Sequence, residues 1–260
     1  MRKVYFILLV VMMTCIGCEW HLRNAQENTE LMIAIDRYDR IEALYLTTGD
    51  VAALHQMNTD YPNQTRTLIE DLLQLGHVND SDINIRFLHF FQDSTLQQIL
   101  DDVAESYADV SDLNEELSTS FTRLKKMLPN LPIPNVYTQI GSLDQSIVIG
   151  DGELGISLDK YLGSNHPIYL KYGYSERQRS TMTRSFIVPD CLGFYLLSYY
   201  PMPQDASAFE REEHLGRVKY CVNSALDRAV FDDDFVKRAE QYVQRHPNES
   251  MDGLLSGMVK

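Results

Sequence analysis

Residues 129–163 read PNLPIPNVYTQIGSLDQSIVIGDGELGISLDKYLG. In this segment β-branched and aromatic residues gather in short runs, and Gly-containing turn sequences separate the runs. Strands are expected at residues 136–140, 145–149 and 154–158. The sequence Gly150-Asp151-Gly152-Glu153 predicts a hairpin turn between the last two of them. The segment therefore predicts a small, mainly antiparallel sheet in the middle of the chain.

Helical patterns flank this sheet on both sides. The clearest runs from residue 110 to 128, where apolar residues recur every three or four positions and Pro129 ends the pattern. Further helices are expected from about residue 36 to Leu46, after a Ser94/Gln97 capping box, and over residues 175–200, 207–228 and 231–244. Residues 31–35 suit a short strand, and Asp232-Asp233-Asp234 suits a helix N-terminus. The helices lie before and after the sheet in the sequence and do not alternate with its strands. This order predicts a predominantly helical α+β fold.

The N-terminus has the pattern of a secretion signal. Arg2 and Lys3 precede an apolar run from Val4 to Met13, which is too short to span a bilayer. Gly17 and Cys18 then resemble a bacterial lipobox, which predicts cleavage before Cys18 and lipid on its thiol. An ordinary cleaved signal and a buried strand are the alternatives. We expect a signal peptide at residues 1–17, a lipidated tether at 18–30 and a single domain at 31–260.

The composition is that of an acidic globular protein. The 260 residues are 44% hydrophobic and carry a net charge of -14, which becomes -16 once Arg2 and Lys3 leave with the signal. Such a charge disfavours binding to nucleic acid or to an anionic membrane surface. Lipid on Cys18 is therefore the expected attachment to the membrane, and two or more acyl chains make such an anchor firm. Cys191 and Cys221 can be two buried thiols or a disulfide.

Several short segments carry a resemblance to a known family. They are IDRYD (35–39), PNVYT (134–138), QSI (145–147), LGISLDKYLG (154–163), IVPD (187–190) and HLGRVKY (214–220). Together with the lipobox they resemble the GldB-type gliding-motility lipoproteins of Bacteroidetes over roughly residues 1–226. The tail after about residue 229 is expected not to match. The resemblance implies an envelope lipoprotein, at the outer membrane or facing the periplasm, with a gluzincin-like (zincin) fold.

A gluzincin uses an edge strand to align its substrate and an HExxH helix to hold zinc. Residues 154–158 are the candidate edge strand, which makes Leu154, Ile156, Leu158 and the following Asp159 candidate groove residues. None of the seven histidines has a partner at i+4, and HExxH is absent from the sequence. We therefore expect no metal and no cofactor.

Three polar residues in the C-terminal half are further candidates. Asp190 lies on an otherwise apolar helix, where a carboxylate must be paired, solvated or protonated, so it is either a groove residue or a first-turn acid. Glu210 and His214 share a helix face one turn apart and could supply two metal ligands. A solvated face is the alternative, since Glu213 and Arg217 suit a surface ion pair.

These expectations lead to a functional hypothesis with two alternatives. The first is a non-catalytic lipoprotein that holds an envelope protein or peptide partner, with an extended segment pairing to residues 154–158 by β-augmentation. The second is a divergent hydrolase that uses Asp190, Glu210 and His214. The third is a glycan- or nutrient-binding surface lipoprotein, whose mark would be a cluster of exposed aromatic residues. Tyrosines such as Tyr195, Tyr199 and Tyr200 suit the core or its rim, although a tyrosine-rich groove could also bind peptide or glycan.

Overall fold

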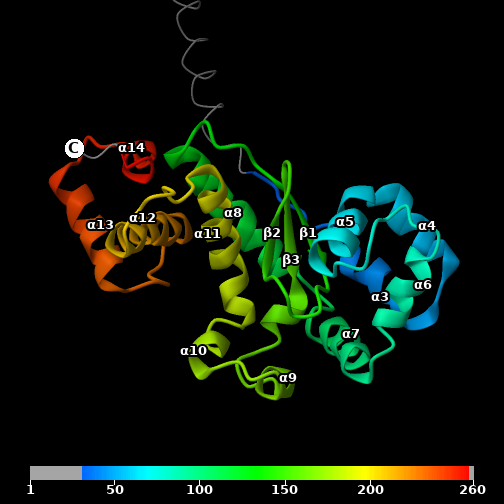
Figure 1. The fold of residues 1–260 in the computed structure, drawn as a ribbon. Helices are drawn as coiled ribbons and strands as arrows, with labels where there is room; N and C mark the ends of the chain where they lie inside the picture. Colours follow the sequence, from blue (N-terminus) through cyan, green and yellow to red (C-terminus); the bar gives the residue numbers. More distant parts are fainter. Residues whose placement is uncertain (1–30, 258–260) are drawn as a thin grey trace, which may run out of the picture. The chain divides into compact units, whose positions relative to one another are not determined.

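A computed structural model of the chain describes residues 31–257. The expected signal peptide (1–17) and the whole lipidated tether (18–30), with Cys18, lie outside the described residues. Residues 32–257 belong to one compact unit. Within it, predominantly helical segments flank a three-stranded sheet, which agrees with the predicted α+β class (Figure 1).

The elements before the sheet are α3 (Tyr38–Thr48), α4 (Val51–Asp60), α5 (Pro62–Arg66), the π-helical η1 (Thr67–Leu72), α6 (Ile83–Phe90), α7 (Ser94–Ser106) and α8 (Ser111–Met127). The strands are β1 (Asn135–Gln139), β2 (Ile147–Ile149) and β3 (Glu153–Ser157). The later elements are η2 (Leu158–Tyr161), α9 (Pro167–Lys171), α10 (Glu176–Arg179), η3 (Arg184–Phe186), α11 (Ile187–Tyr199), α12 (Ala208–Leu226), α13 (Asp234–Arg245) and α14 (Met251–Leu255).

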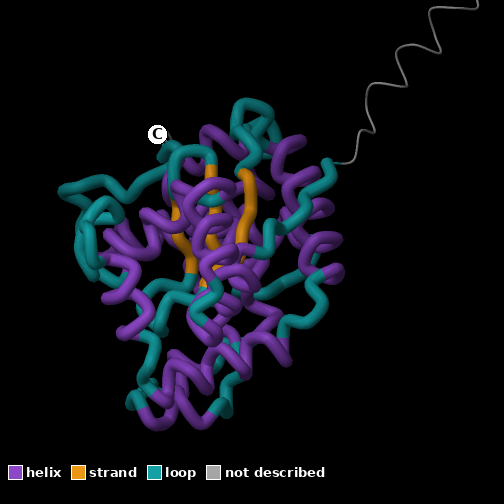
Figure 2. The backbone as a smooth tube through the Cα atoms, turned by 90° about the vertical axis from the view of Figure 1, so that its right-hand side faces the viewer, coloured by secondary structure: helices purple, strands orange, loops and turns teal. Residues whose placement is uncertain are grey.

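The three strands form where they were predicted, but their order is β1-β3-β2. Strand β3 runs parallel to β1, with Val136 opposite Leu154, and antiparallel to β2, with Val148 opposite Gly155. The predicted hairpin turn joins β2 to β3, and the Gly150 N–H donates to the Glu153 carbonyl at 2.9 Å. Figure 2 shows the three strands side by side among the helices. The sheet is therefore mixed, and the prediction of a mainly antiparallel sheet is wrong.

The loop after β1 explains the mixed order. Ser142 and Leu143 both adopt positive φ, at 50° and 67°. The buried carboxylate of Asp159 accepts hydrogen bonds from the Gly141 and Leu143 N–H groups, at 2.9 and 2.5 Å. Because these contacts bend the chain away from β1, β2 does not return beside it, and β3 takes the place next to β1.

The outer side of β1 is covered by the segment that leads into α3. The Asp36 N–H donates to the Val136 carbonyl, and the Thr138 N–H donates to the Asp36 carbonyl, both at 2.9 Å. The expected strand at residues 31–35 does not form. Instead, Asn114 and Ser118 of α8 accept hydrogen bonds from the Ile35 and Ile33 N–H groups, each at 2.9 Å.

Helices α8, α11 and α12 pack together on one side of the sheet. The predicted apolar stripe of α8 is buried, and Phe121 meets Tyr195 of α11 edge to face at 5.6 Å. Cys191 and Cys221 are free thiols in this core. Burial raises the pKa of the Cys191 thiol and raises the pKa of Cys221 to about 12, so both thiols are held protonated.

Two local predictions require correction and one is confirmed. The cap of α7 is Asp93, whose carboxylate accepts from the Thr95 and Leu96 N–H groups, so Ser94 and Gln97 form no capping box there. The helix expected over residues 175–200 is broken, because the buried Met182 turns the chain and its carbonyl accepts from the Gly163 N–H at 3.0 Å. The acid cluster does begin a helix: Asp233 caps α13 through the Phe235 and Val236 N–H groups.

Candidate functional site

Residues 154–158 do not provide an open strand edge. Strand β3 is central and pairs on both sides, so a further strand has no free backbone to join. The side chains of Leu154, Ile156 and Leu158 are fully buried. The edge-strand prediction is therefore wrong, and these three residues form part of the core.

Asp159 is a structural residue that fixes the loop after β1. It is fully buried, and its own carbonyl accepts a 2.7 Å hydrogen bond from the Tyr169 hydroxyl. Burial raises the pKa of its carboxyl group, while the Gly141 and Leu143 N–H donors oppose that rise. A carboxylate occupied in this way holds the fold and does not face a ligand.

Asp190 faces a small cavity between η2, α10 and the first turn of α11. It lies in the first turn of α11, where its Oδ2 accepts a 2.8 Å hydrogen bond from the Tyr161 hydroxyl. A cavity of about 190 Å³ adjoins it, lined also by Ser146, Lys160 and Tyr174. Burial raises the pKa of Asp190 to about 6, although the Tyr161 bond lowers it. Asp190 is therefore near half-protonation in mildly acidic conditions.

Replacing Asp190 with asparagine should stabilise the protein at neutral pH. An aspartate in the unfolded chain has a pKa near 3.9, so the folded protein holds the proton more tightly and its stability falls as pH rises from about 4 to about 6. Asp190→Asn removes that loss, which amounts to about 3 kcal/mol. Urea unfolding at pH 4 and pH 7.5 should show a higher free energy of unfolding for Asp190→Asn than for wild type only at pH 7.5. Asp151→Asn, in the exposed hairpin turn, is the matched control and should show no such gain.

Glu210 and His214 lie on α12 but have separate structural roles. Glu210 completes a capping box with Ser207, whose N–H donates to Glu210 Oε2 at 2.7 Å. His214 is buried, and its Nε2 lies 2.8 Å from the Tyr200 carbonyl oxygen. Asp190 lines a different cavity from these two residues. Within residues 31–257, no three His, Cys, Asp or Glu side chains are grouped so as to hold a metal ion.

A larger pocket lies where the loop after α11 meets α12 and α14, and we call it the tyrosine pocket. Its volume is about 700 Å³, and its lining includes Tyr199, Tyr200, Pro201, Pro203 and His214. Tyr199 is 46% exposed, so an aromatic face is open to a ligand. The Tyr200 hydroxyl donates to Asp252 of α14 at 2.6 Å and fixes one wall. The sequence suggested Tyr199 and Tyr200 as ligand contacts, but gave no sign that α14 closes the pocket.

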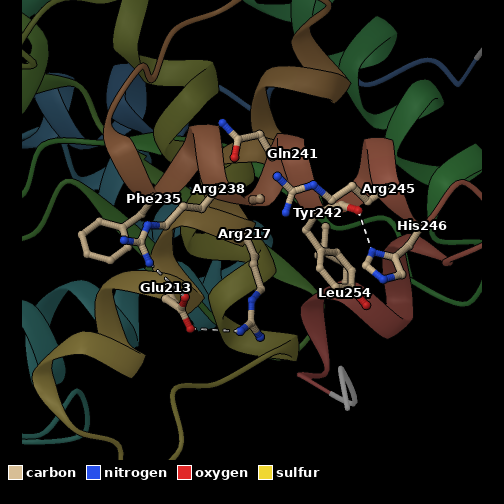
Figure 3. Close-up of a pocket in the computed structure, with 10 residues that line it drawn as sticks. Glu213, Arg217, Phe235, Arg238, Gln241, Tyr242, Arg245, His246 and Leu254 are labelled. Carbon is tan, nitrogen blue, oxygen red and sulfur yellow. Dashed lines mark hydrogen bonds and ion pairs between the residues drawn. The ribbon is translucent and has the colours of Figure 1, made fainter.

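A second pocket adjoins the first across α12, and we call it the arginine pocket. Its volume is about 400 Å³, and Arg217 of α12 and Arg238 and Arg245 of α13 line it. Glu213 and Arg217 line both pockets. Figure 3 shows Arg217 and Arg238 reaching Glu213 from different helices, with the Arg245 guanidinium apart from them.

Sequence reasoning missed the arginine pocket, although part of its pattern is visible. Arg238, Tyr242 and Arg245 follow at i, i+4 and i+7, which places them on one face of α13. Arg217 comes from another helix, α12. The sequence indicated an ordinary surface ion pair between Arg217 and Glu213, which the structure has at 3.7 Å, and so gave no reason to assign Arg217 to a pocket.

Comparison with known proteins gives one match. A family model described as "Gliding motility protein GldB" matches residues 19–251. The match continues through α12 and α13, so the expectation that the resemblance ends near residue 229 is wrong. No curated protein and no solved structure matched the chain. Among residues 31–257, no helix combines the length and the apolar character that crossing a bilayer requires.

Proposed function

Because the chain belongs to the family of the gliding motility protein GldB, a family of cell-envelope lipoproteins, we propose that it is a non-catalytic component that binds an envelope protein partner. The tyrosine pocket is the observation that carries this proposal. Its exposed Tyr199 and neighbouring prolines offer flat, rigid surfaces, and such surfaces bind peptide segments at low conformational cost. The partner segment lies in this pocket and does not extend the sheet.

The structural roles of the hydrolase candidates support binding over catalysis. Glu210 caps a helix, His214 contacts the Tyr200 carbonyl, and Asp190 accepts a bond from Tyr161 in another cavity. The proposal includes a zincin-like fold that has lost its zinc helix. In support, the α11 positions that pack near the sheet are the buried aliphatic residues Ile187, Val188 and Leu192.

Attachment to the membrane is part of the same proposal. Lipid on Cys18 holds the protein at the outer membrane, facing the periplasm or the cell surface. The match to the family begins at residue 19, directly after this cysteine. A tether of about twelve residues between Cys18 and the folded unit would let the tyrosine pocket reach a partner anchored in the same membrane.

Site-specific photocrosslinking of the full lipidated chain in cells tests the proposal. Benzoylphenylalanine at position 199 should give a discrete protein adduct, because Tyr199 faces the pocket. The same replacement at Tyr172, which is 55% exposed and lines no pocket described above, is the matched control and should give none. Equal adducts at both positions, or a glycan adduct at 199, would count against a protein partner. Stoichiometric zinc in the purified full chain would contradict the non-catalytic assignment.

A further inference from the structure

We infer that the arginine pocket binds carboxylate groups of an acidic peptide segment. The inference rests on the proposed function, because the same partner would continue from the tyrosine pocket past Glu213 and Arg217. The pocket supplies guanidinium groups that one glutamate only partly neutralises, aromatic rings hold these groups in position, and the two pockets are continuous.

The arginine pocket has a local excess of positive charge. The chain as a whole carries -14, yet three arginines and a single glutamate line this pocket. Glu213 lies 3.7 Å from Arg217 and 3.9 Å from Arg238, which exceeds the 2.7–2.9 Å of charge-assisted hydrogen bonds. In the part of the chain that the structure describes, Arg245 has no ion-pair partner.

A fully satisfied arginine elsewhere in the protein shows the contrast. The Arg184 guanidinium donates two hydrogen bonds to the Asp112 carboxylate, one from Nε at 2.9 Å and one from Nη2 at 2.6 Å. This is the bidentate geometry that a guanidinium prefers with a carboxylate. The arginines of the pocket lack such a partner, so a ligand carboxylate can supply it.

Aromatic rings hold the side chains of the arginine pocket in position. The Arg238 guanidinium lies over the rings of Phe209 and Phe235, at 5.3 and 5.8 Å from their centroids. These cation–π contacts hold the group while leaving its N–H edge free to donate. On the other side, the His246 ring stacks on Tyr242 with centroids 4.1 Å apart, and a 2.9 Å contact to the Tyr242 carbonyl fixes its Nδ1 (Figure 3). The pocket therefore has rigid aromatic walls.

One ligand can occupy both pockets, because they share lining residues. A segment lying on Tyr199 and Tyr200 reaches Arg217 directly, since that residue lines both pockets. An acidic side chain a few residues along would then enter among Arg217, Arg238 and Arg245. At physiological salt, charges more than about 8 Å away are largely screened, so the overall acidity of the chain does not prevent this local attraction.

Fluorescence anisotropy with the full chain in detergent tests the inference. The probe is a labelled, end-capped tetraglutamate peptide, and the matching tetraglutamine peptide should not bind. Arg245→Gln should weaken tetraglutamate binding at least tenfold, because the unpaired guanidinium is lost. Arg177→Gln removes the same charge from an exposed position on α10, outside the pocket, and should leave the affinity unchanged.

The outcomes separate this inference from the proposed function. Equal tetraglutamate affinity in wild type, Arg245→Gln and Arg177→Gln would overturn the arginine pocket as the site, even if crosslinking at residue 199 persists. Displacement of the peptide by inorganic phosphate at concentrations where acetate has no effect would overturn the assignment to carboxylates. Since Arg245 is exposed, an unchanged thermal melting curve for Arg245→Gln will show that the variant is folded.

Discussion

Gly216→Ala should lower the free energy of unfolding by about 2 kcal/mol, since overpacking a helix contact costs more than alanine gains in helix propensity. A Cβ atom at this position would lie 2.6 Å from the carbonyl carbon of Phe235 and 2.7 Å from its oxygen. These are backbone atoms of α13, so the clash cannot be relieved by rotating a side chain. Helix α13 must move away from α12.

Gly193→Ala is the matched control for this prediction. Gly193 also lies inside a helix, α11, but a Cβ atom there would have its nearest neighbour, Val222 Cγ2, at 4.0 Å. This variant should gain up to about 1 kcal/mol from helix propensity alone. Urea unfolding should therefore give midpoints that move in opposite directions for the two variants. Equal midpoints would show that α12 and α13 do not approach as closely as the structure has them.

Gly216→Ala should also disturb the geometry of the arginine pocket. Gly216 adjoins Arg217 in the sequence, and Phe235 lines the pocket from α13. Moving α13 outward would separate Arg238 and Arg245 from Arg217. Gly216→Ala should therefore also weaken tetraglutamate binding, whereas Gly193→Ala should not.

Elements with a local sequence pattern were predictable. The stripe of α8, the three strands and the acid cluster that begins α13 depend on residues close together in the chain, and all of them form. The strand order was not predictable in this way. It depends on Asp159 binding the loop at Gly141 and Leu143, a contact across 16 to 18 residues that no periodicity records.

In the candidate site too, residue types could be suggested from the sequence, whereas their arrangement depends on contacts between distant segments. Tyr199 and Tyr200 could be suggested from their type, but the pocket that makes them available needs α14 and the loop after α11. Leu154 and Ile156 were assigned to an edge strand because the family resemblance implies a gluzincin-like fold, in which an edge strand aligns the substrate. In the structure β3 is the central strand, so these candidate groove residues are buried in the core.

The acidic face of α3 is a second feature that local sequence patterns do not reveal. Charged residues of a helix normally face solvent, yet Asp39 and Glu42 are both buried against the sheet. Asp39 is paired: Arg37 donates to it at 2.8 Å, and the Thr138 hydroxyl donates at 2.5 Å. Glu42 is only half satisfied. Its Oε2 accepts from the Ile140 N–H at 3.0 Å, while its Oε1 has no partner among the described residues.

Glu42→Gln should therefore stabilise the protein at alkaline pH, by about 2 kcal/mol or more, because a buried unpaired charge is replaced by a neutral amide. Burial raises the pKa of Glu42 well above its usual value, and the nearby Asp39 and Asp159 raise it further. The folded state thus binds the proton more tightly than the unfolded state does. The stability that this proton provides is complete below the unfolded pKa, near 4.3, and is lost as pH rises towards the folded pKa.

Urea unfolding from pH 4 to pH 9 measures this effect as the difference between wild type and variant. The difference should be small at pH 4, where Glu42 is protonated, and should grow in favour of Glu42→Gln as pH rises. Glu115→Gln, on the exposed face of α8, removes the same charge and should show no such trend. Glu42→Ala should instead be less stable than wild type at pH 4, because it leaves a cavity and an unpaired Ile140 N–H. A Glu42→Gln advantage that shrinks with rising pH would mean that the folded protein holds Glu42 as a paired carboxylate.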